Sequence, residues 1–175
     1  FVVMLDQSGG PISGAKNWSS GFMPAVYQGT VLRGQGEPIL DLARPDGTSE
    51  REQRRLLDAL REQNEAHLAA RGEDHDLAAR IASFELAFRM QAHAPDLLDL
   101  SKEDARLKDS YGIGKEPTDA FGRKCLLARK LVEQGVRFIQ LYNGSWDSHD
   151  YIERAHGNLV RQVDQPIAAL IADLK

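Results

Sequence analysis

Two side chains with metal-binding chemistry stand two residues apart in the segment Val136 to Asp150, which reads VRFIQLYNGSWDSHD. Asp147 offers a carboxylate and His149 an imidazole, and together these donors suit zinc and similar divalent cations. Two ligands do not complete a site, so a D-x-H pattern taken alone has a high false-positive rate. The structural alternative is that Asp147 bonds to its own turn while His149 faces solvent.

The elements before this pair indicate a parallel α/β layer. Thr118 or Asp119 opens a predicted helix that runs to Gln134, and Gly135 suits a left-handed cap at its end. The apolar run 136–142 then predicts a strand. The loop after a parallel strand lies on the crevice side of an open sheet, where ligands bind. We therefore expect the D-x-H pair on that side.

A long amphipathic helix follows the pair. Asp150-Tyr151-Ile152-Glu153 resembles a capping box, so we expect Asp150 to cap this helix. Pro166 lies inside an apolar stripe that continues across it, which predicts a kink and not a break. His156 lies on this helix, and we favour packing or solvent exposure for its side chain over a role in the site.

The N-terminal part combines a short apolar run with a long irregular segment. Residues 1–5 predict a buried strand, and residues 6–35 are rich in Gly, Ser, Pro and Asn. Within that segment, Ala25 to Leu32 is a candidate for a short strand or turn. Asp6 follows the strand and is either a ligand or, in the interpretation we favour, the start of a turn. Candidate anchors to a core are Trp18, Phe22, Met23, Val26 and Tyr27.

The middle of the chain predicts a helical hairpin followed by a short helix. Ser49 and Glu52 fit a capping box that opens a helix from about Glu50 to Ala70. A second helix runs from about Asp76 to Ala94, with an apolar stripe and a Glu85–Arg89 pair on its other side. The stripe consists of Leu77, Ile81, Phe84 and Phe88. A further short helix is expected to begin at Ser101 and to stop at Gly112.

The other reactive side chains are weaker candidates for a catalytic role. Ser19 and Ser20 have no identifiable base beside them, so they are weak candidates for a nucleophile. Cys125 lies in phase with apolar neighbours in FGRKCLLARKLV, which favours a small core side chain over a catalytic thiolate. The histidines at 67, 75 and 93 lie on or near predicted helix ends and are interpreted as surface or interhelical groups.

Composition bounds the class of protein. The chain has 175 residues, of which 42% are hydrophobic and 27% charged, as in an ordinary soluble globular domain. Its formal net charge of −4, without a long basic cluster, argues against a nucleic-acid partner. No apolar run approaches the roughly 20 residues of a membrane-spanning helix. Both ends, Phe1 and Lys175, look cut from something longer, so a missing signal peptide says nothing about export.

Several long strings resemble a bacterial family called domain of unknown function 1501. The strings are NWSSGFMPAVYQGT, RIASFELAFRMQAHAP, FGRKCLLARKLVEQGVRFIQLYNG, WDSH and DQPIAALIADLK. Family members are often described as sulfatase-like and are placed in the alkaline phosphatase superfamily. The resemblance covers nearly the whole chain.

The resemblance implies a fold class and a domain plan. We expect an α/β protein, a helix-rich fragment of an alkaline-phosphatase-like sandwich with a largely parallel sheet and a helical insertion. The chain would be one domain fragment with three parts: residues 1–48 form a strand plus a long loop, 49–117 the helical insertion, and 118–175 the helix–strand–loop–helix unit that carries the candidate site.

The resemblance also implies a function. The full-length protein would be a metal-dependent hydrolase of sulfate or phosphate esters, using zinc, manganese or calcium. Because family members often carry export signals, the resemblance implies a location in the periplasm or outside the cell. Asp147 and His149 match the family's W-D-x-H motif and are carried over as metal ligands. The nucleophile and the other ligands would lie elsewhere, so these 175 residues are predicted to be inactive alone.

A non-catalytic binding or scaffold module that keeps the fold is the alternative to the hydrolase. The two hypotheses differ over the loop, because the hydrolase requires Asp147 and His149 to point into a common cleft. We also expect self-association or exposed apolar patches around Phe1–Leu5 and Val136–Tyr142, where flanking strands would be missing.

Overall fold

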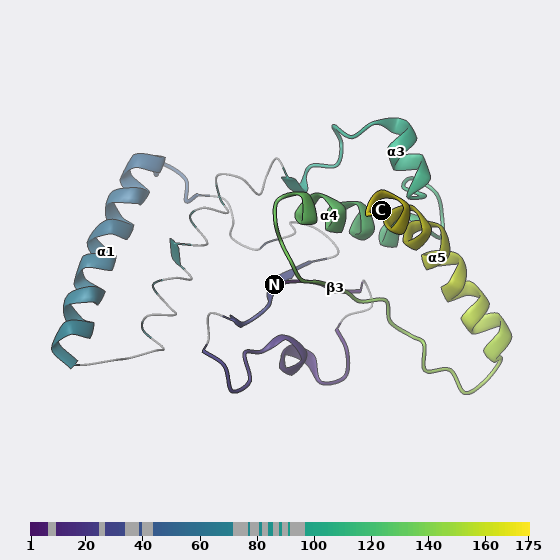
Figure 1. Cartoon of the computed structure of the whole chain (residues 1–175), viewed down its shortest axis with the longest axis horizontal. Helices are drawn as coiled ribbons and strands as arrows, with labels where there is room; N and C mark the ends of the chain where they lie inside the picture. Colours follow the sequence, from purple (N-terminus) through teal and green to yellow (C-terminus); the bar gives the residue numbers. More distant parts are fainter. Residues whose placement is uncertain are drawn as a thin grey trace.

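A small parallel sheet lies at the centre of the molecule (Figure 1). The computed structural model describes residues 1–6, 10–24, 27–33, 39, 44–71, 77, 81, 84–85, 88, 91 and 97–175. Strands β1 (Val2–Met4), β2 (Thr30–Leu32) and β3 (Ile139–Leu141) pair in the order β2-β1-β3, and both pairs are parallel. Met4 stands opposite Leu32 and Leu141, so the carboxyl ends of all three strands meet at one edge. The chain is therefore α/β with a parallel sheet, as predicted.

The strands are shorter than the apolar runs that predicted them. Val3 and Met4 are buried, but Phe1 is 40% exposed and Phe138 is 56% exposed. These two rings lie beyond the amino ends of their strands and contact each other edge to face at 5.5 Å. The apolar sequence therefore extends beyond the paired strand residues, and its two aromatic rings pack against each other outside the sheet.

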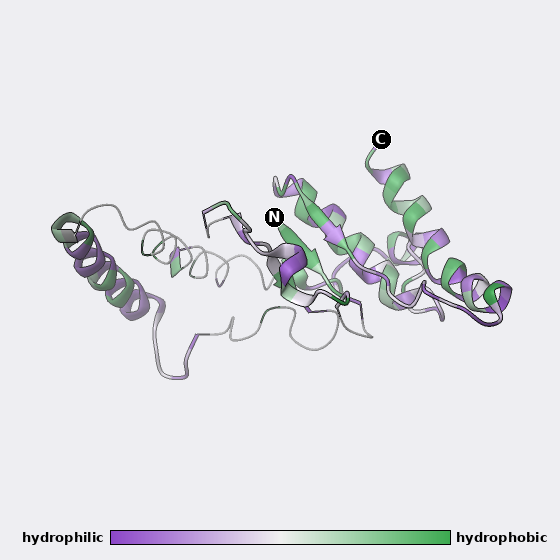
Figure 2. Cartoon of the chain, turned by 90° about the horizontal axis from the view of Figure 1, so that it is seen from below, coloured by the Kyte–Doolittle hydropathy of each residue, from purple (hydrophilic) through white to green (hydrophobic). Residues whose placement is uncertain are grey.

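Helices α4 (Asp119–Glu133) and α5 (Ile152–Asp173) pack on each other and build the core with the sheet. One cluster joins the sheet to α4 through Met4, Leu32, Ala128 and Leu131. A second joins α4 to the preceding segment and to α5 through Tyr111, Phe121, Cys125 and Leu126. In Figure 2, hydrophobic residues cover much of the C-terminal half of α5.

Local signals set the ends of α4 as predicted. Thr118 is the residue before its first turn, and Gly135 takes a φ of +86° directly after it. Such a backbone angle suits glycine, which has no Cβ to clash with the carbonyl. The Gly135 N–H donates to Val132 O, and the Val136 N–H donates to Leu131 O. These two bonds close the helix and direct the chain into β3.

Helix α3 (Ala105–Ser110) begins later than predicted. The expected start at Ser101 is wrong, because the carboxylate of Asp104 accepts the N–H groups of Arg106 and Leu107 and thereby caps the helix. The predicted stop at Gly112 is confirmed by its φ of +68°.

The start of α5 also differs from the prediction. Asp150 does not cap it: Tyr151 holds the cap position with a φ of +51° and forms no side-chain capping bond. The left-handed backbone at Tyr151 moves Asp150 one residue outside the cap. The helix continues through Pro166 to Asp173, so the proline does not break it.

Helix α1 (Glu50–Arg71) stands apart from the sheet in Figure 1. Its predicted capping box is confirmed, since the Ser49 N–H donates to Glu52 Oε2 and the Glu52 N–H donates to Ser49 Oγ. Arg54 forms two bonds to the Glu85 carboxylate, at 2.6 and 2.9 Å. Positions 77, 81, 84–85, 88 and 91 of the predicted second helix are helical, and its remaining residues, Arg89 included, lie outside the described residues.

One of the predicted anchors holds the N-terminal segment. A 3-10 helix, η1 (Gly14–Trp18), ends in Trp18, which is buried and contacts the Tyr142 ring edge to face. Phe22, Met23 and Tyr27 are exposed, which corrects their expected role, and Val26 lies outside the described residues. The anchors differ because Trp18 alone among the described ones comes to lie against Tyr142, at the end of β3.

Candidate functional site

Asp147 and His149 lie side by side in the loop between β3 and α5. The distance from Asp147 Oδ1 to His149 Nε2 is 3.0 Å, and the side chains are 87% and 86% exposed. The structure thus brings the two predicted donors together, and it places them in solvent and not in a cleft.

The tryptophan beside this pair fixes the loop. The Trp146 indole N–H donates to Asn143 Oδ1 at 2.8 Å, and the Trp146 carbonyl lies 2.8 Å from His156 Nε2. The Trp146 and His156 rings are also in contact, with centroids 5.8 Å apart. His156 therefore packs against the loop from α5 and ties the position of Trp146 to the helix.

Left-handed backbone brackets the pair on both sides. Ser145 has a φ of +67° and Tyr151 a φ of +51°, although neither is glycine. A side chain in this region costs about 1 kcal/mol or more, and a bulky residue such as tyrosine is rarely found there. The Arg154 guanidinium stacks over the Tyr151 ring at 4.9 Å, which helps to hold this conformation.

No third protein ligand accompanies the pair in the part of the chain that the structure describes. Among those residues, no three His, Cys, Asp or Glu side chains gather around one point. Asp6, the other carboxylate considered as a ligand, is held elsewhere, at the carboxyl end of β1. The metal role of Asp147 and His149 stays a prediction.

Asp6 belongs to a second polar constellation, centred on Lys124 of α4. The Lys124 ammonium lies 3.7 Å from Asp6 Oδ2 and donates to Tyr142 O at 2.6 Å, with Leu5 O at 3.5 Å. The Lys124 side chain is 9% exposed and that of Asp6 is 17% exposed. Burial lowers the pKa of Lys124, and the nearby Asp6 charge opposes that shift. Lys124 thus joins the carboxyl ends of β1 and β3.

Lys124 was missed by the sequence interpretation, although a signal for it existed. It lies three residues after Phe121 and four before Ala128, which places it on the buried stripe of α4. A lysine on such a stripe needs partners for its ammonium, because burying an unpaired charge is costly.

The other reactive side chains behave as structural groups. Cys125 is fully buried, and burial raises the pKa of its thiol to about 12, so the core interpretation is confirmed. The Ser19 hydroxyl donates to Lys16 O at 3.2 Å, and His67 is exposed on α1. His75 and His93 lie outside the described residues. Among the residues that the structure describes, no helix is long and apolar enough to span a membrane.

Comparison with known proteins gives one match. The family model described as "Protein of unknown function (DUF1501)" matches residues 1–175. No curated protein matches the chain, and no solved structure does.

Proposed function

The chain belongs to the DUF1501 family of proteins of unknown function, and from that premise we propose that it carries part of the metal site of a sulfatase-like hydrolase of sulfate or phosphate esters. In this proposal Asp147 and His149 are two ligands of a divalent cation. The observation that carries it is the placement of a carboxylate oxygen and an imidazole nitrogen 3.0 Å apart on one loop.

The two donor types fit a shared divalent cation. Zinc binds imidazole nitrogen and carboxylate oxygen, and His149 and Asp147 would present one of each from the same loop. The imidazole favours zinc or manganese over calcium, because calcium takes oxygen ligands.

The loop is also conformationally restricted, as expected for a segment that holds a ligand. Strained backbone persists where the surrounding structure holds it in place, and it gathers at functional sites. Here Ser145 and Tyr151 bracket the pair, and Trp146 is bonded both to Asn143 and to His156. These contacts limit the freedom of the loop, and none of them involves the side chain of Asp147 or His149.

The chemistry that such an ion supplies when bound is polarisation of an ester oxygen and activation of water. What this chain contributes is the position of two ligands, with open coordination positions for water, an ester or further donors. High exposure supports this role, since an anionic ester can approach the pair from solvent.

Isothermal titration with zinc and with manganese tests the ligand assignment. We expect one saturable site in the native chain and at least about tenfold weaker binding in Asp147→Ala and in His149→Ala. Asp164→Ala and His67→Ala are matched controls, since both residues are exposed and lie elsewhere, and their affinities should stay within about twofold. Unchanged affinity in both loop variants would remove the assignment.

Ester binding tests the hydrolase part of the proposal. Saturation-transfer NMR with p-nitrophenyl sulfate and p-nitrophenyl phosphate should detect binding in the zinc-loaded protein and lose it after EDTA treatment. Equal ester binding with and without the metal would contradict a metal-dependent hydrolase. So would the absence of ester binding in the metal-loaded protein.

A non-catalytic binding module is the second candidate. The observation in its favour is that Asp147 and His149 face solvent and not a common cleft. Under this hypothesis the zinc titration shows no saturable site that depends on the pair, so the same experiment separates the two functions.

A further inference from the structure

A cavity of about 540 Å³ lies between the sheet, α4 and the segment around α3, away from the Asp147–His149 loop. From its size, its apolar walls and its charge we infer that it binds a small organic anion with an apolar body, independently of any metal. The inference goes beyond the proposed function, because none of the lining residues belongs to the loop.

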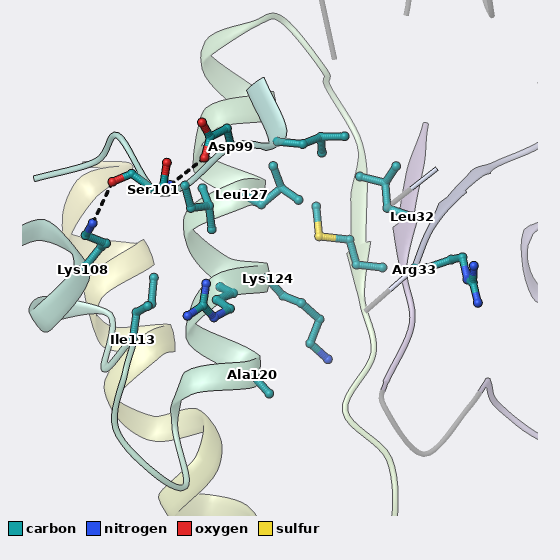
Figure 3. Close-up of a pocket in the computed structure, with 13 residues that line it drawn as sticks. Leu32, Arg33, Asp99, Ser101, Lys108, Ile113, Ala120, Lys124 and Leu127 are labelled. Atoms are coloured by element: carbon teal, nitrogen blue, oxygen red, sulfur yellow. Dashed lines mark hydrogen bonds between the residues drawn. The ribbon is translucent and has the colours of Figure 1, made fainter. Parts of the chain in front are cut away.

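The size and the walls of the cavity suit a small ligand. Pockets for small molecules measure about 300–1,000 Å³ and are mostly apolar, with a few polar groups that fix orientation. Met4 and Leu32 line this cavity from the sheet, Leu127 from α4, and Leu98 from the segment before α3. In Figure 3, Ala120 and Leu127 of α4 lie between Lys108 and Ile113 on one side and the β2 end at Leu32 and Arg33 on the other.

Among the residues that the structure describes, the side chains lining the cavity carry a net charge opposite in sign to that of the chain. The whole chain carries a formal charge of −4. Among the described residues that line the cavity, four side chains are cationic and one, Asp99, is a carboxylate. The four cations are Arg33, Lys108, Arg123 and Lys124.

Nearby carboxylates balance part of this charge. Asp6 lies 3.7 Å from Lys124, and Asp119 lies 2.9 Å from Arg123. Asp99 accepts the N–H of Ser101, and its carboxylate lies 3.8 Å from the Lys102 ammonium. Among the described residues, Arg33 and Lys108 then leave an excess of positive charge at the cavity.

Lys108 is positioned to receive the anionic group. Its ammonium donates to the carbonyl of Ser101 at 3.1 Å, and this bond is drawn in Figure 3. The bond fixes the ammonium at the cavity wall and leaves two of its three N–H donors for a ligand oxygen. A sulfonate, carboxylate or phosphate attached to an apolar ring would place its charge near Lys108 and its ring against Leu127 and Leu98.

Titration calorimetry with naphthalene-2-sulfonate in the presence of EDTA tests this inference. We expect saturable one-to-one binding, and at least about tenfold weaker binding of the neutral analogue naphthalene-2-methanol. Lys108→Gln should weaken sulfonate binding about fivefold, whereas Lys16→Gln, an exposed lysine on η1, should leave it unchanged.

A cavity-filling variant locates the binding site. Ala120→Trp should weaken sulfonate binding at least about tenfold, and Ala172→Trp on the exposed side of α5 should not. Circular dichroism checks that both tryptophan variants fold. If Ala120→Trp does not fold, the Lys108→Gln result alone decides whether the anion binds in this cavity. Absence of saturable binding, equal affinity for the two naphthalenes, or unchanged affinity in Lys108→Gln would overturn the inference. Because EDTA is present, this result is separate from that of the zinc titration.

Discussion

The Lys124 constellation and the Asp147–His149 pair both consist of ionisable side chains, yet they lie in opposite environments. Lys124 is 9% exposed and has two carbonyl oxygens and one carboxylate around its ammonium. Asp147 and His149 are 87% and 86% exposed and interact with each other. Removing one partner from a buried charged cluster is strongly destabilising, because the remaining groups stay buried without it, whereas an exposed pair adds little stability and stays accessible to a ligand.

The difference separates the part of the chain that builds the fold from the part that we propose binds a metal ion. Lys124 connects α4 to the ends of β1 and β3, so its removal should lower the free energy of unfolding of the whole core. The pair lies beyond β3 on a loop held by Trp146, so its removal should lower the affinity for a ligand and leave stability almost unchanged. The variants below test this separation, from the largest expected effect on stability to the smallest.

Lys124→Met should have the largest effect. It leaves Asp6 and the Tyr142 carbonyl without the buried ammonium, which costs about 3 kcal/mol of unfolding free energy. For a chain of this size the melting temperature should fall by about 6–12 °C. Calorimetry measures the change, and a fall of less than about 2 °C would show that Lys124 does not hold the sheet edge.

Tyr111→Phe should have the next largest effect. The buried Tyr111 hydroxyl donates to Asp173 Oδ2 at 2.7 Å, and Arg129 donates to the same oxygen at 2.9 Å. Burial, together with the Asp173 bond, raises the pKa of Tyr111 above its usual range. Loss of this bond to a charged acceptor should cost about 2 kcal/mol in urea unfolding. Arg161→Gln, on the exposed surface of α5, is the control, and an equal loss there would contradict the account.

Cys125 should give stability a dependence on alkaline pH. Burial raises the pKa of its thiol from 9.0 to about 12. The unfolded chain therefore releases this proton first, and the contribution is complete below pH 9 and is lost as the pH rises toward 12. Between pH 8 and pH 10 the loss should be about 1.4 kcal/mol. Urea unfolding of Cys125→Ala should lack this part of the slope, and an identical slope would place the thiol outside the core.

Asp147→Ala and His149→Ala should have the smallest effect on stability. Exposed ion pairs contribute little, so each change should alter the unfolding free energy by less than about 0.5 kcal/mol in the absence of metal. Differential scanning fluorimetry with EDTA is sufficient to measure this. A loss as large as that of Lys124→Met would mean that the pair is structural, and the contrast between the two regions would fail.

Local signals in the sequence predicted much of the fold. The Ser49–Glu52 capping box, the start of α4 and the left-handed Gly135 depend on neighbours within a few residues, and all three are confirmed. The parallel arrangement followed from the helix–Gly–strand order around Gly135. Cys125 was placed in the core by helical periodicity.

Features that depend on distant residues escaped the sequence interpretation. The Lys124 ammonium meets Leu5 and Tyr142, which lie 119 and 18 residues away along the chain. The failure of Asp150 as a cap follows from the left-handed conformation of Tyr151, for which the sequence carries no signal. For the candidate site, the sequence predicted which two side chains to consider, but their 3.0 Å contact and their exposure required the fold.

Zinc titration followed by NMR of the histidine rings tests the central claim most directly. The ring nitrogens of His149 should shift on addition of zinc, and Asp147→Ala should largely abolish the shift. His67, exposed on α1, should stay unshifted at the same zinc concentration. If His149 does not respond, or if it responds equally in Asp147→Ala, the pair is not a metal-binding site and the account is wrong.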